Sequence, residues 1–565
     1  MKKVTIVLTL AMASQIAWSE TQVTGSVHIG AETTPTKETI VTDFDYLSSG
    51  HHYRLEEEDK PVYYDILYGV DMKLRFQQAH SLRLLVDGVF NQGKNMGNRT
   101  ESVYDKDGNL LSQLRSSYLL QRSSPIAQRS NSAAVLPPTS YKVSLLAAYE
   151  GAISQQGSLG VSYRYRIDDA QDQLHQQVLE QTAFTRFASN DYLSRSREEE
   201  HEVDVHYSHA FPFTGGAHRL TAGGRYNYRQ LVQEQLQAWD DVTILNDTFT
   251  HRTHYGAIYA GYQFRYKTLT AMGQVEYRYS RMQEHSLHDV LPMARVAWQV
   301  RERHTLSAQY GVRLIRPTFI HLNPAHVKGA YTDRNGLETL VGTHVHRVSM
   351  NYAFGTSVAQ TERPALIKAT KSSAPPMRTS SLGTPNVRGE VSLFYLTAND
   401  GLTAIWLEKE DIRTYIWGND GLRHAVGLTP MVNWQPVEEL QVHAEATLLW
   451  DKRVAAAIHK QNEHVGIAGQ LQLTHHLPYG LRWGAHCDYS YGNTLDLYSY
   501  EGHGLKIGAM FQANMLKKEN LHLTLRYDYV YAPAVHFITP VSYTGATRRL
   551  LPNRHEIALL LTYDF

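Results

Sequence analysis

The sequence has a single cysteine, Cys487, and no Cys-x-x-Cys pair. One cysteine excludes an intramolecular disulfide and the common cysteine-based zinc sites. The sequence also lacks an excess of either charge, because Lys and Arg together number 55 and Asp and Glu together number 55. Nucleic-acid-binding domains usually carry a basic excess, so this balance gives no support for DNA or RNA as a partner.

Long apolar runs are missing once the first residues are passed. Residues 1–19 have two lysines directly after Met1. The apolar stretch Val4–Met12 follows, and small residues stand at Ala17 and Ser19. This order is typical of a cleavable signal peptide and predicts a mature domain over residues 20–565. No later stretch approaches the roughly 20 apolar residues that a spanning helix needs. Such a chain crosses a membrane only as a closed β-barrel, whose strands satisfy one another's backbone groups.

The dominant pattern is an alternation of apolar and polar residues. In Val62–Phe76 the even-numbered residues are apolar or aromatic, and in Leu521–Tyr531 Leu and Tyr alternate with His, Thr, Arg and Asp. A period of two is typical of strands, and runs this long with 36 tyrosines favour a membrane barrel, although soluble β-sandwiches also alternate. We therefore predict an all-β protein, a transmembrane antiparallel β-barrel of about 20–22 strands.

The connections between these strands alternate in length, as short periplasmic turns and long external loops do. The alternation gives about 20 strands, and an extra hairpin inside residues 94–139 would raise the number to about 22. Residues 356–387 break the alternation, and their Ser, Thr and Pro composition predicts a flexible linker. Long external loops are expected near residues 33–61, 94–139, 168–200, 237–253 and 316–343.

Charged residues on the strands are expected to face the lumen. A charge on the lipid face costs about 2–4 kcal/mol at mid-bilayer, whereas a charge on the lumen face costs little. These residues either line a wet channel or close it by pairing across the lumen. Cys487 falls on the opposite, lipid-facing row. The residues assigned to the lumen include Asp65, Asp71, Lys73, Arg75, Arg313, Arg526 and Asp528.

The chain ends in an alternating strand whose outward row includes Tyr563 and Phe565. A terminal aromatic residue preceded by apolar residues at every second position resembles the insertion signal of outer-membrane barrels. The resemblance implies that the outer-membrane assembly machinery recognises this strand.

Residues 304–354 carry a more specific resemblance. An ascending strand ends at Arg316-Pro317, a Leu-Asn-Pro loop contains Asn323 and Pro324, and a descending strand follows. This order resembles the barrels of TonB-dependent receptors and the outer-membrane β-barrel family close to them. Arg316, Pro317, Asn323 and Pro324 are expected to shape an external loop, since proline ends sheet pairing and Asn-Pro favours a turn.

The resemblance also has a gap. Such receptors place a plug domain before the barrel, but here the alternation begins by about Val62, and the glycine-rich plug segments are absent. Glu20–Thr24 resembles a TonB box, the strand that pairs with TonB, or else begins an ordinary barrel strand. TonB or a separate plug-like protein or lipoprotein therefore remains a candidate partner.

Other candidate sites have simple alternatives. His-x-His at His344 and His346 places two rings on one strand face, a possible metal clamp or merely two interfacial histidines. The acidic runs Glu56–Asp59 and Glu198–Glu200 either attract cations or a basic ligand, or they are solvated loop charges, or they join the divalent-ion-bridged lipopolysaccharide layer. No cofactor or metal site and no catalytic triad is predicted.

We therefore expect an outer-membrane barrel that takes up or passes a solute, with membrane lipid and lipopolysaccharide around it. The alternative is a structural or assembly protein whose barrel is filled by a separate partner. An enzyme is not expected.

Overall fold

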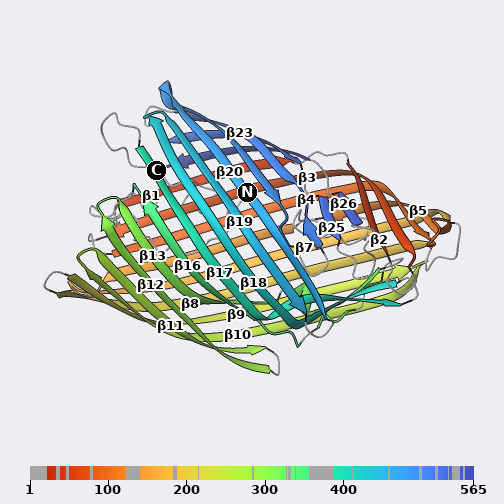
Figure 1. Ribbon diagram of the computed structural model, residues 1–565, viewed down its shortest axis with the longest axis horizontal. Coiled ribbons are helices and arrows are strands. Elements are labelled where there is room, and N and C mark those ends of the chain that lie inside the picture. Colours follow the sequence, from red (N-terminus) through yellow and green to blue (C-terminus); the bar gives the residue numbers. More distant parts are fainter. Residues whose placement is uncertain are drawn as a thin grey trace.

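The computed structural model describes residues 22–565 apart from several connections (Figure 1). The predicted signal peptide and almost all of the predicted linker lie outside the described residues. The residues not described are 1–21, 34–37, 46–49, 77–79, 123–139, 182–187, 214–215, 283–284, 318, 326, 329–331, 338, 356–385, 410–411, 456–458, 495–498, 516–519, 532–533, 538–546 and 551–553.

The described strands form a closed antiparallel barrel of 20 strands, which confirms the predicted fold. Each strand of the wall pairs with its neighbours in chain order. In order around the wall the strands are β1 (Gln22–Thr33), β3 (His52–Phe76), β4 (His80–Tyr104), β6 (Ser140–Ala152), β7 (Gly157–Gln181), β8 (Ser189–Phe213), β9 (Gly216–Trp239), β10 (Val242–Tyr266), β11 (Leu269–Met282), β12 (His285–Arg301), β13 (His304–Ile315), β16 (Thr343–Phe354), β17 (Asn386–Lys409), β18 (Ile412–Val437), β19 (Leu440–Ala455), β20 (Lys460–Leu477), β21 (Leu481–Tyr491), β23 (Gly504–Met515), β24 (Leu521–Tyr531) and β27 (Arg554–Asp564).

Closure of the barrel joins the first and last strands. β1 pairs with β27 from Ser26 opposite Asp564 to Thr33 opposite Ile557. The backbone nitrogens of Gly25 and Phe565 each donate to the other's carbonyl, at 3.0 and 2.9 Å. Both ends of the described chain therefore lie at the rim that carries the short turns, which is the periplasmic rim of such barrels.

The extra hairpin in residues 94–139 does not add spanning strands. β4 pairs with β6 along its periplasmic half and with β5 (Leu110–Arg122) along its outer half. β7 does the same on the other side. β5 and β6 thus occupy one position in the wall, end to end, and the count stays at 20.

Several predicted external loops are mostly paired strand. β7 and β8 pair without interruption from Gly157 opposite His209 to Gln177 opposite Ser189, so the described residues of the 168–200 range form the two arms of an extended hairpin. Residues 237–253 are strands around a tight turn, Asp240-Asp241, with φ of 49° and 64°. The loop prediction was wrong there because both sheet faces meet water beyond the bilayer, so pairing continues without an apolar row.

The remaining elements are short. β2 (Glu38–Asp45) pairs with the outer end of β3. The β13–β16 connection contains α2 (Phe319–Leu322), β14 (Val327–Lys328) and β15 (Thr332–Asn335). A separate three-stranded sheet contains β22 (Ser499–Glu501), β25 (Ala534–Phe537) and β26 (Thr547–Leu550), and η4 (Pro478–Gly480) is a turn. No helix among the described residues is long and apolar enough to cross a membrane.

Strand parity is preserved across the long connection after β16. Phe354 lies opposite Gly389 in the antiparallel β16–β17 pair, so the connection leaves and re-enters at the periplasmic rim. β16 therefore ends, and β17 begins, at the rim where the other connections are short.

The outer face carries apolar side chains, and the inner face carries polar ones. Ile258 and Val290 are 67 % and 57 % exposed on the outward rows of β10 and β12. The inward rows of the same strands carry buried polar residues such as Thr253 and Asp289. Cys487 lies on the outward row of β21 with Trp483 and Tyr489, and it is a free thiol.

Tyrosine–histidine pairs on the outer face mark both borders of the apolar band. In each of seven neighbouring-strand pairs, a tyrosine hydroxyl lies 2.7–3.0 Å from Nδ1 of a histidine two positions nearer the outer rim. We call these seven pairs the upper belt. It comprises Tyr163–His201, Tyr226–His254, Tyr277–His288, Tyr310–His346, Tyr395–His424, Tyr489–His503 and Tyr527–His555.

A similar row, the lower belt, follows the periplasmic rim. It comprises His80–Tyr149, Tyr207–His209, His218–Tyr262 and His304–Tyr352. His218 is level with Phe264, ten residues along β10 from His254 of the upper belt. At about 3.3 Å per residue and a tilt of about 40°, the belts lie about 25 Å apart, which is the height of the apolar band of an outer-membrane barrel.

Candidate functional site

The inner wall along β7 to β11 carries a continuous network of ion pairs. Asp204 binds Arg225 Nε at 3.1 Å and accepts from the Tyr259 hydroxyl at 3.0 Å. Arg278 Nη2 lies 2.6 Å from a Glu276 carboxylate oxygen. Because most of these charges are paired, this part of the wall is polar without a strong excess of either sign. Further pairs are Arg164–Glu202, Arg166–Glu200 and Arg229–Glu198.

A second charged cluster lies beside the closing seam. Asp528 is fully buried, and its carboxylate lies 2.9 Å from Lys506 Nζ and 3.2 Å from His486 Nε2. Lys506 also reaches Glu556 at 2.8 Å, and Arg526 reaches Glu32 of β1 at 3.3 Å. The cluster thereby links five strands on both sides of the β1–β27 junction.

The other residues assigned to the lumen lie on the same row of β3 or on β13. Asp65 accepts from Asn91 at 2.7 Å, and Asp71 pairs with Arg83 at 2.6 Å. Lys73 and Arg75 continue this row towards the periplasmic rim. Arg313 is exposed on the row of β13 opposite the apolar one.

Loop 316–343 folds against the inner wall, and an amide ladder on β9 holds it. The Asn323 side-chain nitrogen donates to Gln233 Oε1 at 2.6 Å and to Gln235 Oε1 at 3.3 Å. Gln237 donates to the Lys328 carbonyl at 2.7 Å. Neighbouring Ser194, Tyr192 and Asn190 on β8 accept from Gln233, Gln235 and Gln237 in turn.

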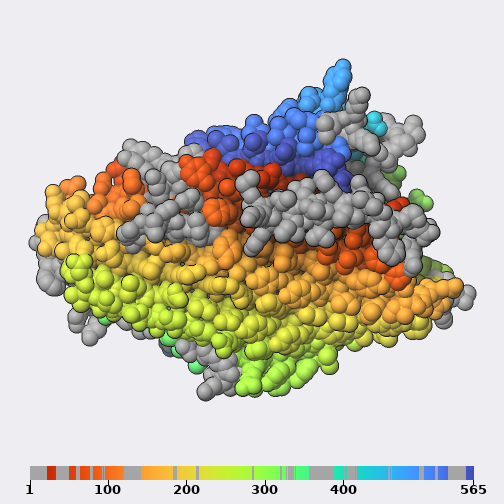
Figure 2. Space-filling view, turned by 180° about the vertical axis from the view of Figure 1, so that it is seen from behind, coloured from red at the N-terminus to blue at the C-terminus, as the bar shows by residue number. Residues whose placement is uncertain are grey.

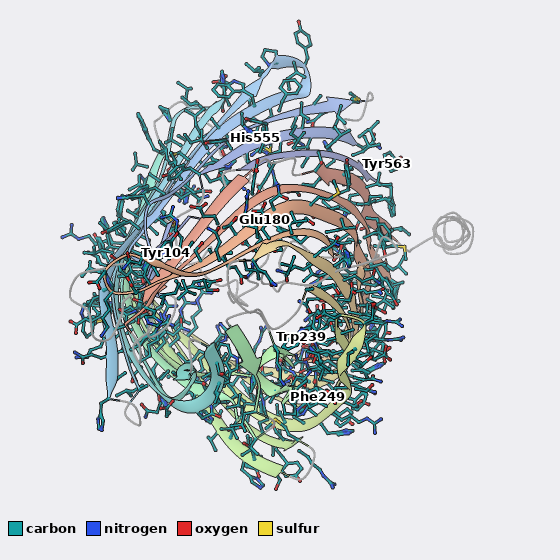
Figure 3. All side chains as sticks on the ribbon, turned by 90° about the vertical axis from the view of Figure 1, so that its right-hand side faces the viewer. Tyr104, Glu180, Trp239, Phe249, His555 and Tyr563 are labelled. Carbon is teal, nitrogen blue, oxygen red and sulfur yellow. The ribbon has the colours of Figure 1, made fainter. Side chains whose placement is uncertain are left out.

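Apolar contacts and strand pairing also hold loop 316–343 in place. Leu322 and Leu340 of the loop pack with Phe249 of β10 in a buried cluster, against which Leu402 and Trp417 lie. Phe249 and Trp239 point towards the interior when the barrel is viewed from its outer end (Figure 3). β15 pairs in parallel with Arg413–Ile416 of β18, so the loop is held from two sides of the barrel.

The four residues of the receptor-like loop motif have different environments. The Arg316 guanidinium lies 3.9 Å from the Tyr255 ring centroid, and burial lowers the pKa of Arg316. Pro317 and Asn323 are buried, whereas Pro324 is exposed. Their part in shaping the loop stays a prediction. Gln233, Gln235 and Gln237 were not among the predicted site residues, although they repeat at the strand period on the inward row of β9.

Two exposed arginines lie on adjacent strands of the inner wall. Arg313 of β13 and Arg347 of β16 are exposed, and their strands are adjacent, with Arg347 opposite Gly311. Arg347 stacks on the Phe394 ring at 4.4 Å. Among the described residues neither guanidinium meets a carboxylate, so this wall presents positive charge to the lumen.

The histidines and acidic residues that the sequence offered as candidate sites form pairs with neighbouring side chains. His346 bonds Tyr310 in the upper belt, while His344 Nε2 lies 2.8 Å from Asp289. Within the described ranges no three potential metal ligands gather. Glu57 and Glu198–Glu200 lie in strands rather than loops, and arginines bind them. The expectation of solvated loop charges was therefore wrong for these residues.

The sequence of residues 153–540 matches the model of the outer membrane protein beta-barrel family. The chain belongs to this family. The match spans well over half of the chain and includes the amide ladder, loop 316–343 and the unpaired arginines. As a member of the outer membrane β-barrel family, the protein resides in the outer membrane. Comparison with curated proteins gives no match.

Solved outer-membrane receptors share the fold of this family member. The ferripyoverdine receptor of Pseudomonas aeruginosa is 11% identical, with a TM-score of 0.54, over 96% of this chain and 72% of that one. The ferric preacinetobactin receptor BauA of Acinetobacter baumannii is 9% identical, with a TM-score of 0.51 over 95% and 80%. The transporter YddB of Escherichia coli is 10% identical, with a TM-score of 0.50 over 96% and 81%. These structures are receptors and transporters, not enzymes.

The first and last described strands of the chain are both part of the barrel wall. The described part of the segment that resembles a TonB box pairs with β3, with Val23 opposite Leu74 and Thr24 opposite Lys73. These residues therefore begin an ordinary strand. Tyr563 and Phe565 lie on the outward row of the closing strand, with rings 6.4 Å apart. Their role as an insertion signal stays a prediction.

Proposed function

We propose that the barrel passes a hydrophilic, anionic solute across the outer membrane, and that loop 316–343 narrows this path. The observation that carries the proposal is the seating of this loop on the inner wall by the amide ladder. Each bond of the ladder contributes only about 1 kcal/mol net, so the amide ladder by itself adds modestly to the seating of the loop and can be weakened without disturbing the barrel wall.

The sign of the solute follows from the charges of the lumen. The wall of β7 to β11 is neutralised by ion pairs, while Arg313 and Arg347 are exposed and unpaired among the described residues. Unpaired lumen arginines raise the local concentration of anions. Guanidinium groups also bind carboxylates and phosphates bidentately.

Conductance in planar lipid bilayers tests the proposal. The variant Gln233→Leu/Gln235→Leu removes both acceptors of Asn323, so we expect a conductance several-fold above wild type. The control Gln470→Leu/Gln472→Leu changes two glutamines of β20 and should conduct like wild type. In a salt gradient, Arg313→Gln/Arg347→Gln should shift the reversal potential towards cations. Equal conductance of all variants, or an unchanged reversal potential, contradicts the proposal.

A barrel filled by a separate plug-like protein is the second candidate. The exposed arginines favour it, because an acidic plug surface would pair with them as well as a solute would. Affinity purification from outer membranes distinguishes the two. A stoichiometric partner that Arg313→Gln/Arg347→Gln releases supports the plug, whereas a purified barrel that conducts alone supports solute passage.

A further inference from the structure

A cluster of cations lies on the lipid-facing side of the barrel. Arg252 and His254 are two residues apart on the outward row of β10, and Arg281 of β11 lies directly opposite His254. All three side chains are exposed. His288 of β12 is opposite Tyr279, one position further into the band on the same face. Four basic groups thus occupy neighbouring positions on three adjacent strands.

The cluster lies at the outer border of the apolar band. His254 and His288 both belong to the upper belt, through bonds of 2.9 and 2.7 Å to Tyr226 and Tyr277. The face formed by β8 to β12 is a broad surface in the space-filling view from behind (Figure 2). The basic groups therefore stand where lipid headgroups of the outer leaflet begin.

Within the part of the chain that the structure describes, no carboxylate pairs with these two arginines. The outward neighbours opposite Arg252 and Arg281 are Gln230 and Ser286, both uncharged. The next carboxylate across the sheet, Glu199, already binds Arg197 Nε at 2.9 Å. Among the described residues neither Arg252 nor Arg281 has an acidic partner. Unpaired cations on a lipid face call for an anion supplied by the membrane.

We propose that Arg252, Arg281 and the two belt histidines bind the phosphate groups of lipopolysaccharide. Guanidinium pairs bind phosphate oxygens with short, charge-assisted hydrogen bonds. A histidine whose Nδ1 accepts a hydrogen bond from the tyrosine hydroxyl carries its own proton on Nε2, and this N–H is a further donor for the same phosphate. The lipid binds on the outside of the barrel, so this site is independent of solute passage.

Native mass spectrometry of the detergent-solubilised barrel tests the site. The probe is bisphosphorylated lipid A, compared with its enzymatically dephosphorylated form. Wild type should bind the bisphosphorylated lipid at least about tenfold more tightly than the other form, since two charge-assisted pairs are at stake. Arg252→Gln/Arg281→Gln should remove most of this preference. Arg313→Gln/Arg347→Gln, which removes the same charge from the lumen, should leave it unchanged.

Two outcomes would overturn the assignment. One is equal binding of both lipids by wild type, and the other is a preference in Arg252→Gln/Arg281→Gln within twofold of wild type. Migration of the unheated protein as a compact band in electrophoresis shows that each variant is folded. Conductance of Arg252→Gln/Arg281→Gln should match wild type, so failure of this site and failure of the proposed function are distinguishable.

Discussion

At the scale of single residues, the inner face distinguishes buried charges from screened ones. Asp528 is fully buried among Lys506, His486 and Arg526, whereas Asp71 and its partner Arg83 are 35% and 44% exposed. Removing one partner from a buried cluster leaves the others without compensation, while exposed pairs are screened by water. We therefore expect the two aspartates to contribute differently to the free energy of unfolding, although both lie on the polar row of an alternating strand.

We predict that Asp528→Ala lowers the free energy of unfolding by about 1.5–3 kcal/mol, because Lys506 and Arg526 lose their shared carboxylate but keep Glu556 and Glu32 as partners. Urea unfolding from lipid vesicles, followed by tryptophan fluorescence, measures the change. The matched variant Asp71→Ala should cost less than about 1 kcal/mol. Equal losses in the two variants would show that the seam cluster contributes nothing beyond an ordinary surface pair.

At the scale of elements, loop 316–343 behaves as part of the inner wall. Its helical turn α2 carries His321, whose ring meets Trp417 of β18 edge-on, with centroids 4.2 Å apart. Burial lowers the pKa of His321 below its usual value near 6.5. A proton is therefore bound more weakly when the loop is seated than when it is released.

Acid should therefore loosen the loop. The seated state is most stable above pH 6.5, where His321 is neutral in both states, and this stability is lost as the pH falls from 6.5 towards the lowered pKa. We predict that conductance rises between pH 7.5 and pH 5. His321→Phe keeps the ring beside Trp417 and should conduct alike at both values. A pH response of wild-type size in His321→Phe would assign the effect to another group.

At the scale of the whole molecule, the two Tyr–His belts set the height of the membrane-spanning band. Each histidine accompanies a tyrosine at the border, with the apolar rows lying between the belts. Tyrosine suits this border because its ring is apolar and its hydroxyl is polar. The spacing of about 25 Å therefore predicts the bilayer thickness that the barrel prefers.

We predict that folding from urea is most efficient into vesicles whose hydrocarbon core is about 25 Å thick, and that it declines in thicker bilayers because of hydrophobic mismatch. A series of phosphatidylcholines with increasing chain length, assayed by heat-modifiable electrophoresis, measures the yield. A yield that rises steadily with thickness would show that the belts do not mark the borders.

The period-two pattern was sufficient to predict the barrel. Val62–Phe76 and Leu521–Tyr531 lie within strands of the wall. Alternating apolar and polar side chains fit a strand that has lipid on one face and water on the other. The pattern failed outside the bilayer. There both faces meet water, so paired strands such as the outer parts of β7 and β8 look like loops.

The amino-acid order by itself determined the class of fold, the approximate strand number and the apolar and polar row of each membrane-spanning strand, because all three follow from a local repeat and from the cost of placing charge in hydrocarbon. Only the tertiary structure decided which residues meet. Asn323 and Gln233 are separated by 90 residues, and Arg526 and Glu32 by 494. Such contacts depend on strand register and barrel closure, which bring distant segments together and leave no trace in local periodicity.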